Sequence, residues 1–181
     1  MTTYTLTVAA TLDGYIARTH DHAPSDWVSS EEQDLFFADV EAADWSVMGR
    51  HTHEAADRPD RRRIVFSSGG DGWRRPTQLW LDPAGLTPAD LPGLVEAVHP
   101  LRRGLILGGT LVHDWFLAHK AIDHVHLTVE PVRFGAGLPI FTGQGGVDPE
   151  KMFERLGFVR GERRVLNRAG TVFSRWTGGG G

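Results

Sequence analysis

Two adjacent glycines, Gly108 and Gly109, follow a short apolar run and precede a helix-like segment. Residues 105–107 read Leu-Ile-Leu, which is typical of a buried central strand in a parallel sheet. Without Cβ atoms a glycine backbone lets a ligand approach closely. A helix that begins at Thr110 and Leu111 would offer N–H groups suited to a pyrophosphate. A tight turn that binds nothing is the alternative, and this motif alone favours neither.

Two further apolar runs end in residues that suit a phosphate. The first leads into Gly49, Arg50 and Thr52, where a guanidinium can pair with two phosphate oxygens. The second, Ile-Val-Phe at 64–66, leads into the hydroxyls of Ser67 and Ser68. A surface arginine and a capped turn are the alternatives for each motif alone. Open α/β sheets place their ligands at the carboxyl ends of strands, so three such ends together predict a phosphate-bearing ligand.

An acidic residue, Asp13, stands in a turn signal with Gly14 directly after an apolar run at 4–10. Aspartate side chains commonly accept hydrogen bonds from the backbone of such turns. Asp13 is therefore either a turn residue or a polar contact for a substrate at the mouth of a pocket.

Histidines two residues apart raise the question of a metal site, because they share a face in an extended segment. No third ligand stands at a recognisable spacing, so we expect no metal. The absence of cysteine excludes thiolate catalysis and disulfides. No G-x-S-x-G, G-x-G-x-x-G or P-loop motif is present. The three pairs are His20 and His22, His51 and His53, and His124 and His126.

Strands that alternate with helices predict an α/β sheet with helices on its faces, closed by an antiparallel hairpin. A capping box, Ser29 with Glu32, marks one helix start. The expected helices span 29–43, 51–56, 88–98 and 110–119. The expected strands span 4–10, 45–48, 63–66, 79–81, 105–107, 122–132, 155–159 and 171–176.

Length and composition favour one ordinary globular domain over 1–177 of the 181 residues, with a flexible glycine tail at 178–181. The net charge of −4 gives no electrostatic reason to expect nucleic acid or an anionic membrane as partner. We see no signal peptide and no apolar run of about 18 residues. A cytoplasmic protein that acts on a small molecule is therefore expected.

The set of motifs resembles the dihydrofolate reductase superfamily, in which strand ends like 47–52, 66–68 and 106–109 recur in this order. Within it, the chain is most similar to the reductase domain of riboflavin biosynthesis and its stand-alone bacterial relatives. Residues 12–17 and 108–141 carry that closer likeness. The resemblance implies a three-layer α/β fold with a mixed, mostly parallel sheet, and a possible homodimer.

The resemblance also implies roles for residues at the three strand ends, with NADPH as cofactor. Gly49, Arg50 and Thr52 would hold phosphates of the cofactor. Ser67 and Ser68, with Arg50, would favour the 2′-phosphate of NADPH over NADH. The pyrophosphate would lie on a cradle formed by Gly108, Gly109, Thr110 and Leu111.

The substrate side departs from the family patterns. Dihydrofolate reductases carry an acidic residue early in their first long helix, and counting back from Met48 selects Gln33, or Asp34 with one gap. Riboflavin-pathway reductases usually have an acidic residue before the paired glycines, where this chain has Leu107. An apolar side chain cannot accept those hydrogen bonds, which argues against a ribosylaminopyrimidine substrate. Asp13 and Asp34 are therefore the predicted catalytic residues.

These observations predict an NADPH-dependent reductase that transfers a hydride to a small pterin-like or pyrimidine-like substrate. The alternative is a nucleotide-binding protein without catalysis, a sensor or relic that keeps the cofactor site.

Overall fold

A nine-stranded sheet organises the computed structural model, which describes residues 1–179. The strand order is β10-β11-β8-β1-β7-β3-β4-β6-β5. The six central strands, from β8 to β6, are parallel, whereas β5 and the β10–β11 hairpin are antiparallel to their neighbours. The mixed, mostly parallel sheet and the C-terminal hairpin confirm the predicted fold class.

The elements have the following bounds. The strands are β1 (Thr3–Thr11), β2 (Tyr15–Ala17), β3 (Trp45–Gly49), β4 (Arg63–Phe66), β5 (Gly72–Arg75), β6 (Gln78–Leu81), β7 (Arg103–Gly108), β8 (His124–Glu130), β9 (Leu138–Pro139), β10 (Val159–Val165) and β11 (Val172–Thr177). The helices are α1 (Ser30–Ala42), α2 (Arg50–Ala55), α3 (Leu91–Val95), α4 (Thr110–Ala118) and α5 (Pro149–Arg155), with a 3-10 turn at Pro24–Asp26.

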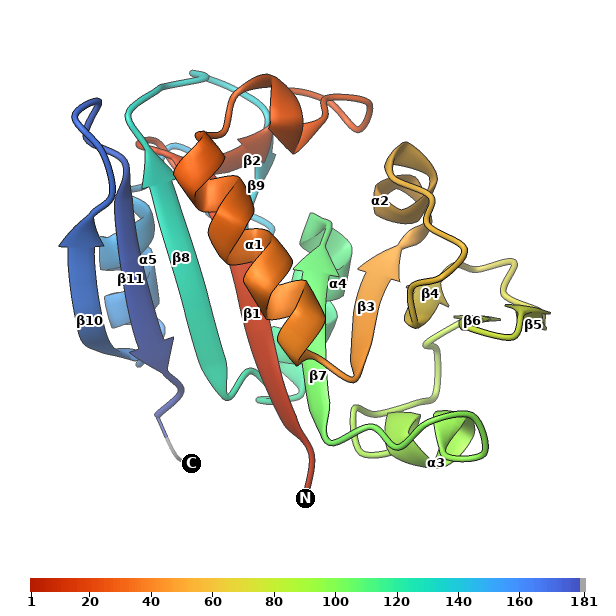
Figure 1. Ribbon diagram of the computed structural model, residues 1–181. Coiled ribbons are helices and arrows are strands. Elements are labelled where there is room, and N and C mark those ends of the chain that lie inside the picture. Colours follow the sequence, from red (N-terminus) through yellow and green to blue (C-terminus); the bar gives the residue numbers. More distant parts are fainter. Residues whose placement is uncertain (180–181) are drawn as a thin grey trace.

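Helices cover both faces of the sheet. Figure 1 shows α1 in front of the central strands, α4 behind them and α5 behind the β10–β11 hairpin. The central strands bury apolar side chains on both faces, which is why they read as continuous apolar runs. Leu6, Val47, Ile64 and Ile106 are fully buried in these strands. The fold therefore fixes the ends of four adjacent strands to a rigid core.

The helix predicted over 88–98 is much shorter in the structure. Only Leu91–Val95 is helical. The carboxylate of Asp90 accepts hydrogen bonds from the N–H and hydroxyl of Thr87, and the Pro88 carbonyl accepts one from the Tyr4 hydroxyl at 2.7 Å. These bonds fix the first residues of the predicted helix in a turn.

The strand predicted over 155–159 is wrong except at its last residue, because helix α5 runs to Arg155 and a turn follows it before β10 begins at Val159. Asp148 caps α5 by accepting the N–H of Lys151 at 3.1 Å, and Pro149 takes the first helical position. Met152 and Phe153 are the buried side chains on the inner face of the helix. The edge strand β10 begins only at Val159. The short strands β2, β5 and β9 were not predicted.

Both termini of the described chain lie at the end of the sheet where the parallel strands begin, opposite the carboxyl ends of these strands (Figure 1). β1 starts there at Thr3, and β11 ends there because Thr177 pairs with His124 at the start of β8. The predicted glycine tail begins within this structure, since the N–H of Gly178 donates to the Asp123 carbonyl at 2.8 Å. Residues 180–181 lie outside the described residues.

Candidate functional site

The three predicted phosphate motifs lie side by side at the carboxyl edge of the sheet. β7, β3 and β4 are parallel neighbours, so their carboxyl ends point the same way. Met48 pairs with Gly108, and Gly49 pairs with Phe66, the residue before Ser67. The juxtaposition expected from the sequence is therefore present.

The glycine turns of β3 and β7 are close to each other. A Cβ on Gly49 would lie 3.9 Å from the carbonyl oxygen of Gly108 and from the backbone nitrogen of Gly109. Gly108 has a φ of +104°, which favours glycine. A Cβ on Gly109 would meet no atom of the described residues within 4 Å. The packing of the protein thus leaves open space directly before α4.

The first turn of α4 presents donors to this space. The first N–H groups of a helix have no partner within the helix, and here they belong to Thr110 and Leu111. Leu111 is 79% exposed, so the surface at this turn is open. The hydroxyl of Thr110 donates to the Pro139 carbonyl at 2.7 Å. Thr110 can therefore serve a phosphate through its backbone N–H, while its hydroxyl is engaged by Pro139.

A cation and three hydroxyl residues follow the strand ends of β3 and β4. Arg50 is exposed, and within residues 1–179 no carboxylate lies within 4 Å of its guanidinium. Thr52 is half-buried two residues further along α2. The oxygen of Ser67 accepts the N–H of Gly69 at 3.3 Å, which leaves its hydroxyl hydrogen free, and Ser68 is exposed. The site can thus offer a permanent positive charge and hydroxyl donors to an anion.

Asp13 is engaged in holding two loops together. Its carboxylate accepts the hydroxyl of Thr11 at 2.6 Å and the N–H groups of Phe134 and Gly135 at 3.2 and 2.8 Å. Burial raises the pKa of Asp13, but these hydrogen bonds outweigh it and the pKa falls below its ordinary value. A carboxylate held ionised in this way is a poor proton donor, and the geometry favours the turn interpretation over the catalytic one.

Replacing Asp13 by asparagine is expected to lower the free energy of unfolding by about 1–2 kcal/mol at pH 7, because charge-assisted bonds to Phe134 and Gly135 are lost. A depressed pKa in the folded state contributes stability above the unfolded pKa, and this stability is lost as pH falls through the folded pKa. The free energy of unfolding, measured by denaturant melts at pH 7 and pH 3, should therefore differ less between the two pH values in the variant than in the wild type. An equal pH dependence in both proteins would contradict this role.

The buried carboxyl of α1 is Glu32, which the sequence did not select. Asp34 lies on the exposed side of the helix, because residues two apart on a helix point to different faces. Glu32 is 6% exposed and faces the sheet. Glu32, and not Asp34, is therefore the buried carboxyl of α1, and we take it as a further candidate acid.

The capping box explains why the carboxyl of Glu32 is free. The N–H of Glu32 donates to the Ser29 hydroxyl oxygen at 3.2 Å, as predicted. In a complete capping box the Glu32 carboxyl would accept the Ser29 N–H. Here Glu130 of β8 accepts that N–H at 2.8 Å, and it also accepts the Ser29 hydroxyl at 2.7 Å. Glu130 also accepts the Thr171 hydroxyl at 2.7 Å. Within residues 1–179 no hydrogen bond reaches the Glu32 carboxyl.

The surroundings of Glu32 favour its protonated form. Burial raises its pKa to about 7, and the negative charges of Glu130 and Asp39 add to the shift. Asp39 is itself held by the Thr7 hydroxyl at 2.7 Å and by His126, whose Nδ1 lies 2.9 Å away. A carboxyl that titrates near neutral pH is suited to act as a general acid.

A buried histidine, His113, lies behind the glycine pair. Its Nδ1 is 2.8 Å from the Ile140 carbonyl, so Nδ1 carries the proton and Nε2 is a lone-pair acceptor. A Cβ on Gly108 would lie 3.3 Å from Nε2, and Nε2 has no hydrogen-bond partner among the described residues. Burial lowers the pKa of His113 to about 4, so it stays neutral near pH 7.

Histidines of two of the pairs contact residues other than their pair partner. His53 accepts a hydrogen bond from Arg63 at 3.1 Å, and His126 contacts Asp39. No group of three or more potential metal ligands gathers among residues 1–179. No helix in the described part of the chain is long and apolar enough to cross a membrane.

The strand order, the hairpin and the glycine-ended parallel strands define the dihydrofolate reductase-like fold. A model of the RibD C-terminal domain matches residues 2–160. The chain belongs to the RibD C-terminal domain family. No curated protein matches the chain by sequence.

Solved structures share this fold at low identity. A putative riboflavin biosynthesis protein from Shewanella sp. PV-4 has a TM-score of 0.67 at 20% identity, over 97% of this chain and 98% of that one. RibD from Acinetobacter baumannii has a TM-score of 0.73 at 17% identity, over 98% of this chain and 58% of that one. Dihydrofolate reductase from Enterococcus faecalis, complexed with NADP(H) and RAB-propyl, has a TM-score of 0.62 at 18% identity, over 97% of this chain and 95% of that one. The superfamily resemblance is thereby confirmed.

Proposed function

We propose that the protein is an NADPH-dependent reductase that acts on a small pterin-like or pyrimidine-like substrate. The observation that carries the proposal is the open space beside Gly109, next to the first N–H groups of α4 and to Arg50, which has no carboxylate within 4 Å among residues 1–179. Relatives named as reductases support the same class of chemistry.

The residues at the strand ends fit a dinucleotide phosphate. Gly109 leaves room for the pyrophosphate, and the N–H groups of Thr110 and Leu111 would hold it. Arg50 with Ser67 and Ser68 would hold the 2′-phosphate. NADPH, when bound, supplies the hydride, and the protein supplies position, shielding and a proton.

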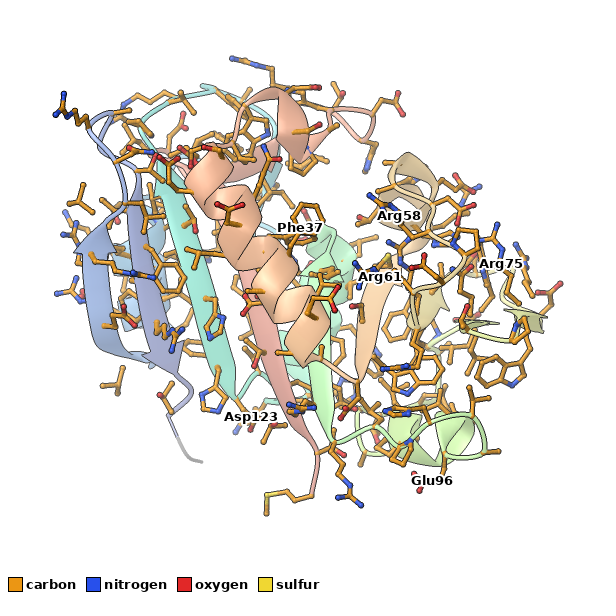
Figure 2. The ribbon with its side chains drawn as sticks, viewed as in Figure 1. Phe37, Arg58, Arg61, Arg75, Glu96 and Asp123 are labelled. Carbon is orange, nitrogen blue, oxygen red and sulfur yellow. The ribbon has the colours of Figure 1, made fainter. Side chains whose placement is uncertain are left out.

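The substrate side offers a proton donor and an aromatic surface. Glu32 would give its proton to a ring nitrogen of the substrate as a general acid. Figure 2 shows Phe37 on the side of α1 that faces α2, and Phe37 is 46% exposed. An exposed phenyl ring can stack on a flat heteroaromatic substrate. The apolar, half-buried Leu107 before the glycines favours a substrate without polar groups at that point.

A thermal-shift titration with NADPH, NADH and NADP+ tests the cofactor. A ligand that binds only the folded state raises the melting temperature by mass action. We expect the largest rise with NADPH. The absence of any rise at millimolar nucleotide would contradict the proposal.

Replacing Arg50 by alanine is expected to weaken NADPH about tenfold and NADH no more than about twofold, because only NADPH carries the 2′-phosphate. Isothermal titration of both nucleotides measures the two losses. Arg168→Ala, which removes an exposed arginine in the β10–β11 turn, is the matched control. Equal losses for both nucleotides would assign Arg50 to another phosphate.

A nucleotide-binding protein without catalysis is the second candidate. Two observations favour it: Asp13 is engaged by neighbouring loops, and Leu107 stands where riboflavin-pathway reductases usually have an acid. Oxidation of NADPH with a pterin, a flavin precursor or a quinone, followed at 340 nm, would exclude it.

We also propose that the protein forms a homodimer, and sedimentation measurements would test its oligomeric state.

A further inference from the structure

A second buried carboxyl, that of Glu130 at the end of β8, lies beside the start of α1. Glu130 is 3% exposed, and its carboxylate accepts three hydrogen bonds from two segments that are distant in sequence. Ser29 donates its N–H and its hydroxyl, and Thr171 donates its hydroxyl at 2.7 Å. In Figure 1 the first turn of α1 lies beside the arrowhead of β8. These donors stabilise the carboxylate against the cost of burying its charge.

The two donor residues of Glu130 are themselves fixed by their neighbours. Thr171 is 1% exposed, and the Asn167 amide donates to its hydroxyl oxygen at 2.9 Å. Oδ1 of Asn167 also accepts the Thr171 N–H at 3.1 Å. Ser29 caps α1 by accepting the N–H of Glu32. The carboxylate of Glu130 is therefore held in one place, between the start of α1 and the turn that joins β10 and β11.

The bonds to Glu130 deprive Glu32 of the donor that its place in the helix offers. If the Glu32 carboxyl accepted the Ser29 N–H, that bond would stabilise its ionised form. Glu130 accepts this N–H instead, and no hydrogen bond within residues 1–179 reaches the Glu32 carboxyl. Glu32 is thus buried beside a negative charge and without a donor. Both conditions favour its protonated form.

Two negative charges act on Glu32. Burial is the largest cause of its raised pKa of about 7, and the charges of Glu130 and then Asp39 add to it. Asp39 lies further along α1 and is paired with His126 of β8 at 2.9 Å. The other ionisable side chains on α1 and on the segments around it are Asp26, Glu31, Asp34, Glu41, Tyr4 of β1, Arg103 of β7, His124 of β8 and Arg168 of the hairpin turn.

We propose that Glu130 is a positioning residue of the proposed reductase: it takes both donors of Ser29 and so keeps the Glu32 carboxyl free to carry a proton for the substrate. The inference rests on the proposed function for the use of that proton. The effect of Glu130 on Glu32 exists without any substrate or cofactor, and it can be measured separately.

A carboxyl titration followed by NMR measures this effect directly. In protein labelled with 13C at the glutamate carboxyls, the Glu32 signal is the one lost in Glu32→Gln, and it should titrate near pH 7 in the wild type. In Glu130→Gln the proton affinity of Glu32 should fall at least about tenfold, because a neutral amide replaces the charge and the Ser29 N–H becomes available. The control is Glu96→Gln, an exposed glutamate at the end of α3 (Figure 2), which should leave the titration unchanged.

The pH profile of turnover provides a second readout. In Glu130→Gln, kcat at pH 7 should fall at least about fivefold and recover as the pH is lowered to 5, because Glu32 would hold its proton only at lower pH. KM should change by less than about twofold. A purely structural role of Glu130 would instead lower kcat at every pH.

The outcomes distinguish this inference from the proposed function. An unchanged Glu32 titration in folded Glu130→Gln would overturn the role of Glu130. A wild-type Glu32 that titrates near its ordinary value of 4.5 would also overturn it, and this result needs no variant to fold. A Glu130-dependent titration in a protein that oxidises no NADPH would keep the role of Glu130 and reject the reductase.

Discussion

Replacing Glu32 by glutamine is expected to lower reductase turnover about hundredfold at pH 7, since a general acid contributes that much or more. Glu32 is the buried carboxyl of α1, and burial raises its pKa to about 7. Glutamine has nearly the same shape and cannot supply the proton. The measurement is kcat as a function of pH, and the fall in kcat above pH 7 should disappear in the variant.

The same substitution is expected to stabilise the fold above pH 7. The folded protein keeps the Glu32 proton up to about pH 7, whereas the unfolded chain releases it near the ordinary value of 4.5. The folded state therefore binds more protons in this window, and stability falls as pH rises through it, by about 3 kcal/mol. Glutamine has no proton to lose, so denaturant melts of the variant at pH 5.5 and 8.5 should differ by less.

Asp34→Asn is the matched control, because Asp34 lies on the exposed face of the same helix. It should leave both turnover and the pH dependence of stability unchanged. Loss of turnover in Asp34→Asn with full activity in Glu32→Gln would restore the assignment made from the sequence.

Replacing Gly109 by valine is expected to abolish measurable NADPH binding, a loss of at least about a hundredfold, with only about 1 kcal/mol of stability lost at the helix start. No atom of the described residues lies within 4 Å of the added Cβ, so the fold accommodates the side chain. The added methyl groups would instead occupy the space proposed for the pyrophosphate. Isothermal titration and a thermal melt measure the two effects.

Gly93→Val is the control for this experiment. Gly93 also has open space around its Cβ position, but it lies in α3, away from the glycine turns. Its nucleotide affinity should equal that of the wild type. Normal NADPH affinity in Gly109→Val would place the cofactor elsewhere.

The juxtaposition of the three strand ends could be predicted because each strand end is defined by residues local in sequence. An apolar run followed by glycine defines a strand end, and parallel pairing brings such ends together. Gly49 and Gly108 followed this rule, and their strands pair as expected. Whether a hydroxyl remains free could not be predicted, since the Thr110 hydroxyl is used by Pro139, which is distant in sequence.

The substrate side depends on packing between distant segments. Which face of α1 is buried follows from its contact with β1 and β8, and not from its distance to Met48. The signal for Glu32 was present as the capping box, but a cap does not reveal that Glu130 makes the reciprocal bond. The late start of α3 is similar, because the Tyr4 hydroxyl, distant in sequence, donates to the Pro88 carbonyl in the turn before the helix.

The position of the termini has a consequence for how this fold can be combined with other domains. β1 begins and β11 ends at the edge of the sheet remote from the glycine turns. A polypeptide fused before Thr3 or after Thr177 would start at the far side of the sheet from the glycine turns of β3 and β7. The Thermotoga maritima deaminase/reductase, of which this chain covers 56%, shows that a chain with this fold can be part of a larger enzyme. The position of the two termini therefore leaves the carboxyl ends of the parallel strands clear of a covalent neighbour at either end.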